Sequence, residues 1–319
     1  MTQICLGTWA WGNKLIWGYS PEKDDPALKE TFLTAIEGGI QIVDTADSYG
    51  TGALTGRSEE LLGDFIKNLP NDQQSSLTVA TKLAPFPWRL GRKGFQKAFS
   101  ASKERLQGHL HRVQLHWSTS RYAPWQEAQL LEGLGDLYEN GSIKEIGLSN
   151  IGPNRLKWMH QLLKKREIPI KSIQIQMSLL SPNIEARTNM YKICKELEIE
   201  LLAYSPLALG ILAIPPGESI IPQTFIRKNL FKNIVPKTKE IRQALYDISN
   251  EHKTSQVQVA LNWCRSHGAS PIVGLRNPKQ AKDAAGAIKW ELNNEEKVLL
   301  DNLSNECSGL LPMNPFISD

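Results

Sequence analysis

Short apolar runs typical of β-strands alternate with helical patterns along the chain, and this alternation limits the possible folds more than any other feature. Eight such units fit within the 319 residues. Strands separated by helices form parallel sheets, so the pattern predicts one (β/α)8, or TIM, barrel domain over residues 1–319. No Gly-x-Gly-x-x-Gly sequence follows any run, which argues against a doubly wound dinucleotide-binding sheet. The predicted strands are Gln3–Gly7, Ile40–Asp44, Leu77–Lys82, Arg112–His116, Ile146–Ser149, Ser172–Gln176, Glu200–Tyr204 and Ser270–Val273.

Helical patterns fill the intervals, except for two long connections. Residues 11–26 follow the first strand, and residues 211–236 follow the seventh and contain four prolines. Connections of this length usually carry function, so we expect long loops at the mouth of the barrel. The predicted helices are Asp25–Glu37, Ser58–Lys67, Gly94–Leu106, Gln126–Glu139, Asn154–Lys165, Ile184–Leu197, Lys239–His252, Ser255–Ser266 and Lys279–Ala287.

Charge and cysteine content exclude several classes of function. A formal charge of +4 without a basic block argues against nucleic-acid binding and is compatible with a small anionic ligand. The chain has no long apolar run and no leader-like segment, so we expect a cytoplasmic protein without a membrane span. The oligomeric state is open, with a monomer favoured. Metal binding is not expected, because the cysteines lack paired spacing: Cys5, Cys194, Cys264 and Cys307.

Polar side chains end three consecutive predicted strands. Asp44 ends the second strand, Lys82 the third and His116 the fourth, and Tyr49 follows Asp44 closely. The carboxyl ends of barrel strands meet at one face, so these side chains should face one volume. Asp44 can neutralise Lys82, whose ammonium is expected to lower the pKa of Tyr49 and make it a better proton donor. His116 could orient a carbonyl oxygen, and a bound cofactor would have to supply hydride.

Each of these residues has a simpler explanation when it is considered alone. Aspartate at a strand end is commonly a cap or turn residue, histidine is commonly packed in a core, and a terminal lysine is commonly solvated. Their coincidence at three adjacent strand ends favours a catalytic site.

The later strands also end in polar residues. Asn150 and Gln176 carry amides that can bind a carboxamide, and the ring of Tyr204 can stack on a flat heterocycle. Together with Ser149, these residues suit nicotinamide.

A turn that precedes a predicted helix suits phosphate. Gly274 and Arg276 lead to Gln280 near the start of that helix, where backbone donors and a guanidinium favour an anion. Tryptophans could line a flat apolar substrate pocket, and Trp17 and Trp117 are the candidates we retain.

Taken in order from Gly7-Thr8-Trp9 to Gln280, these motifs resemble the aldo-keto reductase family. The resemblance implies that Asp44, Tyr49, Lys82 and His116 form the catalytic tetrad, with Tyr49 as proton donor and NADPH as cofactor. The cofactor contacts that it implies are Thr8, Trp9, Ser149, Asn150, Gln176, Tyr204, Ser205, Pro206, Leu207, Gly210, Gly274, Arg276 and Gln280.

More narrowly, residues 7–13, 44–52 and 115–119 resemble plant-type pyridoxal reductases, which implies reduction of pyridoxal to pyridoxine with NADPH. A general reductase of aromatic aldehydes or dicarbonyls is an alternative. So is a slow NADPH-binding redox sensor similar to potassium-channel β subunits. A lyase or isomerase on the same barrel would bind no nucleotide.

The chain departs from the family pattern at three places. Ile211–Pro215 replaces the usual Leu-Thr-Gly-Lys-Tyr after Gly210, Ala284 stands where asparagine is usual, and an N-terminal hairpin is largely missing. These departures imply weaker cofactor binding and leave the tetrad unchanged.

Overall fold

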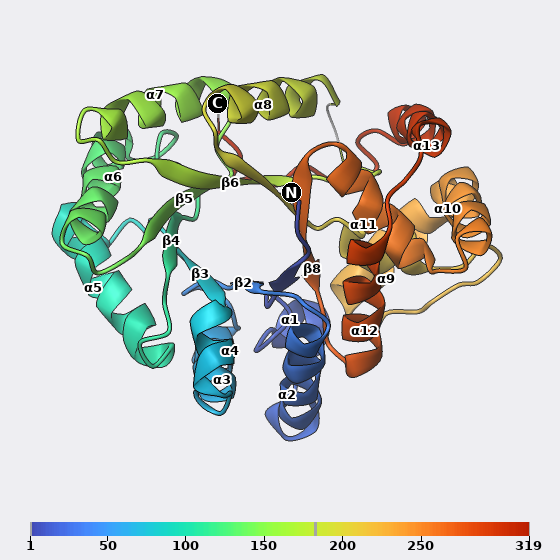
Figure 1. The fold of residues 1–319 in the computed structure, drawn as a ribbon, viewed down its shortest axis with the longest axis horizontal. Coiled ribbons are helices and arrows are strands. Elements are labelled where there is room, and N and C mark those ends of the chain that lie inside the picture. The colour runs from blue at the N-terminus through green and yellow to red at the C-terminus, as the bar shows by residue number, and fades with distance from the viewer. Residues whose placement is uncertain (1, 182–183, 319) are drawn as a thin grey trace.

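The computed structural model describes residues 2–181 and 184–318, and eight parallel strands in it close into a barrel in chain order (Figure 1). The last strand pairs with the first, with Cys5 opposite Ile272. The predicted (β/α)8 fold is confirmed, and the strand ends differ from prediction by only a few residues. The strands are β1 (Cys5–Gly7), β2 (Ile42–Asp44), β3 (Thr78–Leu83), β4 (Arg112–Leu115), β5 (Glu145–Ser149), β6 (Ile170–Gln176), β7 (Glu200–Tyr204) and β8 (Ala269–Gly274).

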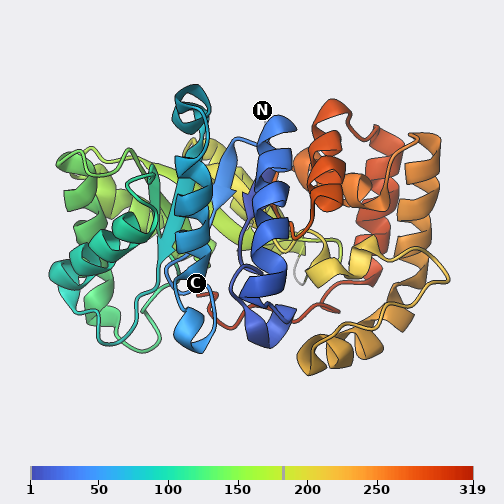
Figure 2. The same ribbon diagram turned by 90° about the horizontal axis from the view of Figure 1, so that it is seen from below.

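Helices surround the barrel on its outside (Figures 1 and 2). Their apolar faces pack against the outward side chains of the strands and form the main hydrophobic core. None of the helices in the described residues has the length and apolar character needed to cross a membrane. The helices are α1 (Lys14–Trp17), α2 (Pro21–Glu37), α3 (Arg57–Lys67), α4 (Asn71–Ser76), α5 (Gly91–Arg105), α6 (Pro124–Glu139), α7 (Pro153–Lys164), α8 (Ile184–Glu196), α9 (Phe225–Ile234), α10 (Lys239–Glu251), α11 (Gln256–Ser266), α12 (Pro278–Gly286) and α13 (Asn294–Glu306).

Both long connections contain more helix than the sequence pattern predicts. Residues 11–26 hold α1 and the first turns of α2, which begins at Pro21 and not at Asp25. Proline is favoured at the first helical position, because its missing N–H would have no intrahelical acceptor there. Residues 211–236 hold α9 and the end of a 3-10 helix, Ala208–Ala213. The two insertions therefore present ordered side chains to the mouth of the barrel.

The barrel interior is layered. At its N-terminal end, the Arg112 guanidinium is 2% exposed and lies 2.7 Å from Glu145 and 3.1 Å from Glu200. Polar side chains gather again at the carboxyl ends of the strands. Between these two layers lies a small apolar cluster: Cys5, Ile42, Leu202 and Ile272.

All four cysteines are buried and free. Burial raises the pKa of Cys194 to about 12, which keeps its thiol protonated. No group of three or more histidine, cysteine, aspartate or glutamate side chains in residues 2–181 and 184–318 is arranged to hold a metal ion.

Candidate active site

Lys82 lies near the end of β3, and each of its three ammonium protons makes a hydrogen bond to another group of the protein. Its Nζ lies 2.5 Å from Asp44 Oδ2, 2.8 Å from the carbonyl oxygen of Thr45 and 3.0 Å from Tyr49 Oη. Burial opposes the charge, but Asp44 and then Tyr49 keep the pKa of Lys82 above its ordinary value. The amine therefore stays protonated, and the carboxylate of Asp44 offsets the cost of burying it.

Asp44 is held by two glutamine amides in addition to Lys82. Gln114 Nε2 donates to Asp44 Oδ1 at 3.0 Å, Gln174 Nε2 donates to the same oxygen, and Gln174 Nε2 also lies 2.9 Å from Gln114 Oε1. Strand alternation predicts that Gln114 faces inward with His116. The part played by Gln174 was missed, because 130 residues separate it from Asp44. These contacts fix the carboxylate behind Lys82.

Tyr49 Oη accepts from Lys82, so its own proton remains available to a substrate. The expectation that Lys82 gives Tyr49 a lowered pKa is wrong: burial raises the pKa of this phenol more than the ammonium lowers it. Tyr49 consequently keeps its proton at neutral pH, and a proton donor needs that state.

His116 follows β4, and its ring centroid lies 5.9 Å from that of Tyr49. Burial, followed by the charges of Lys82 and Arg89, holds the pKa of His116 well below its ordinary value, so the imidazole is neutral. Its Nδ1 lies 3.3 Å from Ser48 Oγ. A neutral imidazole that accepts the Ser48 proton at Nδ1 carries its own proton on Nε2, as a hydrogen-bond donor beside Tyr49. The structure thus brings all four predicted catalytic side chains together.

A second ion pair fixes the loop that carries Tyr49. Asp47 pairs with Arg89 and accepts from the Ala84 backbone N–H at 3.2 Å, and Arg89 also donates to the Ala84 carbonyl oxygen at 2.7 Å. Burial raises the pKa of Asp47 to about 6, although Arg89 opposes this. The pair was not predicted from the sequence, where its signal is the position of Asp47 between Asp44 and Tyr49.

Asn150 connects the ends of three strands. Its amide nitrogen lies 3.0 Å from the carbonyl oxygen of His116 and 3.1 Å from Ser149 Oγ, and its amide oxygen accepts from Tyr204 Oη at 2.7 Å. Asn150 adopts a left-handed backbone with φ 60°. Three of the residues expected to bind nicotinamide therefore form one network beside His116.

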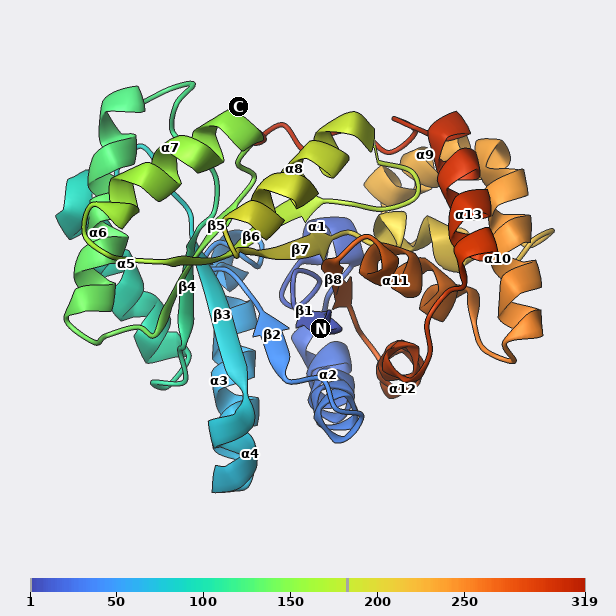
Figure 3. The same ribbon diagram turned by 45° about the horizontal axis from the view of Figure 1, so that its top comes forward.

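Gln176, the fourth of these residues, is bound by the C-terminal segment. Its Nε2 donates to the Pro312 carbonyl oxygen at 2.9 Å, and its Oε1 accepts from the Asn314 N–H at 2.8 Å. Further along, Ser318 forms a parallel bridge with Ile151, just before the start of α7 (Figures 1 and 3). The sequence pattern gave no sign that this segment would reach the site.

Trp117 and Trp17, both expected in a substrate pocket, have different surroundings. Trp117 stacks on Phe316 of the C-terminal segment with centroids 4.4 Å apart, and it lies 4.8 Å from the His116 ring. Trp17 lies edge-on to Trp9 at 5.9 Å. The C-terminal segment therefore forms one wall beside His116.

The residues expected at the phosphates and adenine follow β1, β7 and β8. Thr8 is buried, and Ser58 donates to its hydroxyl at 2.6 Å. Gly274 has open space around its α-carbon, and the Arg276 N–H donates to Gln280 Oε1 at 2.9 Å. A tight turn follows β7, with left-handed backbone at Ser205, Ala208, Leu209 and Gly210; it also includes Pro206 and Leu207.

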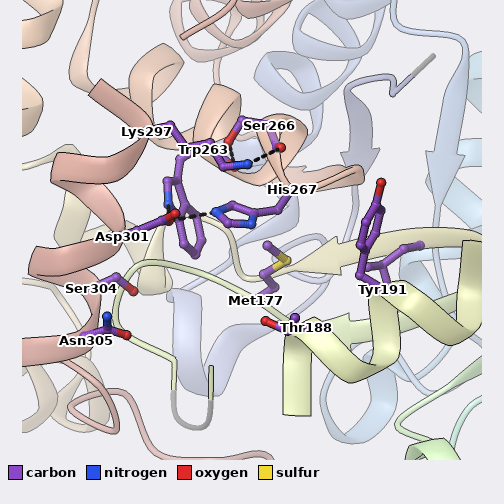
Figure 4. Close-up of a pocket in the computed structure, with 11 residues that line it drawn as sticks. Met177, Thr188, Tyr191, Trp263, Ser266, His267, Lys297, Asp301, Ser304 and Asn305 are labelled. Carbon is purple, nitrogen blue, oxygen red and sulfur yellow. Dashed lines mark hydrogen bonds and ion pairs between the residues drawn. The ribbon is translucent and has the colours of Figure 1, made fainter. Parts of the chain in front are cut away.

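A cavity of about 370 Å³ lies outside the barrel wall, where side chains of α8, α11 and α13 meet (Figure 4). His267 Nε2 and Trp263 Nε1 both lie 2.8 Å from Asp301 Oδ1 there. This cavity contains none of the predicted site residues.

Comparison with known proteins identifies the family of this chain. The model of the aldo/keto reductase family matches residues 3–305. The chloroplastic pyridoxal reductase of Arabidopsis thaliana is 44% identical over 314 residues, covering 98% of this chain and 85% of that protein.

Solved structures show the same fold. The glycerol dehydrogenase of Gluconobacter oxydans superposes with a TM-score of 0.76 at 23% identity, over 99% of this chain and 95% of that one. A Bombyx mori aldo-keto reductase in complex with NADP superposes with a TM-score of 0.67 at 21% identity, over 94% of this chain and 88% of that one. The extent of the family match and the identity to the Arabidopsis protein establish that this chain belongs to the aldo/keto reductase family of oxidoreductases.

Proposed function

We propose that this protein reduces the aldehyde group of a small aromatic substrate to an alcohol with NADPH, and that pyridoxal, reduced to pyridoxine, is the favoured substrate. The proposal depends on one observation: Lys82 donates its three protons to Asp44, to the Thr45 carbonyl oxygen and to Tyr49. Tyr49 accepts in this contact, so its own proton is left for a ligand. The identity to the Arabidopsis pyridoxal reductase supports the choice of substrate.

In this proposal, the side chains handle the proton and the carbonyl oxygen. Tyr49 donates its proton to the substrate oxygen, and Lys82 stabilises the phenolate that remains. Asp44 keeps Lys82 charged, and neutral His116 donates a hydrogen bond to the same oxygen. The bound cofactor would supply the hydride, so hydride and proton together convert the aldehyde to the alcohol.

The cofactor assignment rests on the fit of several residues. Ser149, Asn150 and Tyr204 lie together at the strand ends beside His116, where an amide-bearing ring could bind. Gly274 leaves room for close approach, and the Arg276 guanidinium beside it suits a phosphate. The NADP complex of the Bombyx mori relative supports this choice, and we expect NADPH to bind more tightly than NADH.

Tyr49→Phe tests the mechanism, because it removes the proton and keeps the ring. NADPH oxidation with pyridoxal should slow by about 10²- to 10⁴-fold. Tyr246→Phe is the matched control, since Tyr246 is 41% exposed on α10. Turnover of the Tyr49 variant near that of the control would show that another group donates the proton.

An aldehyde panel tests the substrate. We expect kcat/KM to be higher for pyridoxal than for nitrobenzaldehyde or a small dicarbonyl. Equal values across the panel would favour a general reductase, and very slow release of NADP with all of them would favour a redox sensor. The cytoplasmic location stays a prediction.

A further inference from the structure

Two arginines from distant parts of the chain lie against one indole ring. Arg227 belongs to α9 within the 211–236 connection, and Arg276 precedes α12. The guanidinium carbons of Arg227 and Arg276 lie 4.3 Å and 5.3 Å from the ring centroid of Trp17. Two like charges on one aromatic side chain repel each other, so the protein bears a cost for holding them together.

No carboxylate pairs with either guanidinium within 4.0 Å in the described residues, although the charge of Asp24 acts on Arg276. Burial, and then the charge of Arg276, lowers the pKa of Arg227 to about 10. In the same described residues, the buried Arg227 Nε and Trp17 Nε1 have no acceptor. Two uncompensated positive charges are costly, and an anion beside the guanidinium groups would offset their repulsion.

The arginine pair lies beside the turn that follows β7. Arg227 Nη2 donates to the carbonyl oxygen of Leu209 at 3.0 Å. That turn has left-handed backbone at Ser205 and at residues 208–210, including a φ of 98° at Gly210. Within it, the N–H groups of Ala208 and Gly210 already donate to the carbonyl oxygens of Ser205 and Leu207. The Arg227 guanidinium is therefore the positively charged group at this turn.

We propose that Arg227, carried on Trp17, binds the pyrophosphate of the dinucleotide and supplies the cation that the Ile211–Pro215 sequence lacks. This inference rests on the proposed function, in which Arg276 contacts the adenosine 2′-phosphate. It assigns to α9 a binding role that the sequence pattern did not reveal.

A purely structural role does not account for the arrangement. Thr224 Oγ1 already donates to the Ile16 carbonyl oxygen at 2.7 Å, and Arg276 Nη1 donates to that of Trp17 at 3.0 Å. The first bond joins the 11–26 and 211–236 connections without Arg227, and the second joins residues 11–26 to the turn before α12. If the arrangement only held the two connections together, a second positive charge would add repulsion. At an anion site, the same charge adds affinity.

Arg227→Gln tests the assignment in fluorescence titrations of the full chain with NADPH and with NADH. Both dinucleotides contain the pyrophosphate, so both dissociation constants should rise by about 10- to 100-fold. Arg276→Gln should weaken NADPH alone, because NADH lacks the 2′-phosphate. Lys228→Gln removes a charge from the next residue of α9 and should leave both constants unchanged, and Arg227→Lys should recover part of the loss.

Several results would overturn the inference. The inference is wrong if Arg227→Gln weakens the binding of NADPH only, or of neither nucleotide beyond the Lys228 control. A variant that unfolds at a lower temperature but binds both nucleotides as the Lys228 control does would indicate that Arg227 only holds the two connections together. If the wild type bound neither nucleotide, the proposed function would fail as well, whereas wild-type binding with an unaffected Arg227 variant would refute this inference alone.

Discussion

Tyr49 and His116 have pKa shifts in opposite directions, and both shifts keep the side chain in its neutral, proton-bearing form. Burial is the largest cause in both cases. Lys82 lies beside the two residues and remains charged because Asp44 neutralises it. One buried ion pair therefore allows two neutral donors to face the same volume.

The pH dependence of turnover follows from these shifts. In the proposed mechanism, carbonyl reduction needs protonated Tyr49, whose pKa is raised above its ordinary value of about 10 by burial. The kcat for reduction should therefore stay level from about pH 6.5 to about pH 10 and fall only above that range. No change in the kcat for reduction is expected around pH 6.5, because His116 is already neutral at that pH. Alcohol oxidation needs the phenolate, so its kcat should rise with pH over the same interval. Steady-state rates in both directions check this, and a fall in reduction centred between pH 6.5 and 8 would contradict it.

The C-terminal segment packs on Trp117 and forms the wall that we expect on the substrate side of the site. Phe316 stacks on this indole, while Pro312 and Asn314 bind the Gln176 amide. The segment therefore contacts residues on both sides of the expected site, with Trp117 on the substrate side and Gln176 on the nicotinamide side.

Ending the chain after Leu311 should raise the KM for pyridoxal by about fivefold, because an aromatic stacking partner contributes about 1 kcal/mol. The kcat should change less, since the tetrad makes its contacts without this segment. Phe316→Ala should give a large part of the effect, and Met313→Ala, at a 59% exposed position, should give little. An unchanged KM in the truncated protein, with its unfolding temperature preserved, would count against this wall.

Strand alternation predicted the orientation of the expected catalytic side chains, but not their supporting contacts. A period of two groups the residues of each strand by face, and Lys82 and Gln114 were assigned to the inward face on the assumption that the small residues of the third strand point inward. Gln174 and the C-terminal segment act through contacts between distant residues, which local patterns do not encode. Arg227 was missed because α9 is a short helix in a proline-rich connection that reads as a loop.

The whole barrel has charge layers at both ends, with the apolar cluster around Ile42 between them. At the N-terminal end, Arg112 is buried while its partners Glu145 and Glu200 are 29% and 40% exposed.

Removing both acids should destabilise the fold, because Arg112 would remain buried without a counter-charge. We expect Glu145→Gln with Glu200→Gln to lower the free energy of unfolding by about 3 kcal/mol in urea denaturation. Adding Arg112→Met to this pair should restore most of the loss, since an apolar side chain can replace a buried ion. No recovery in the triple variant would mean that the arginine contributes more than its charge.

The four buried thiols have a practical consequence for following the molecule in solution. Native cysteines that are buried and protonated react slowly with thiol reagents, so a single cysteine introduced on the surface becomes the preferred target. Ile221, 79% exposed in the connection that carries α9, is such a position. A dye attached there would report on that connection during turnover, without removal of any native cysteine.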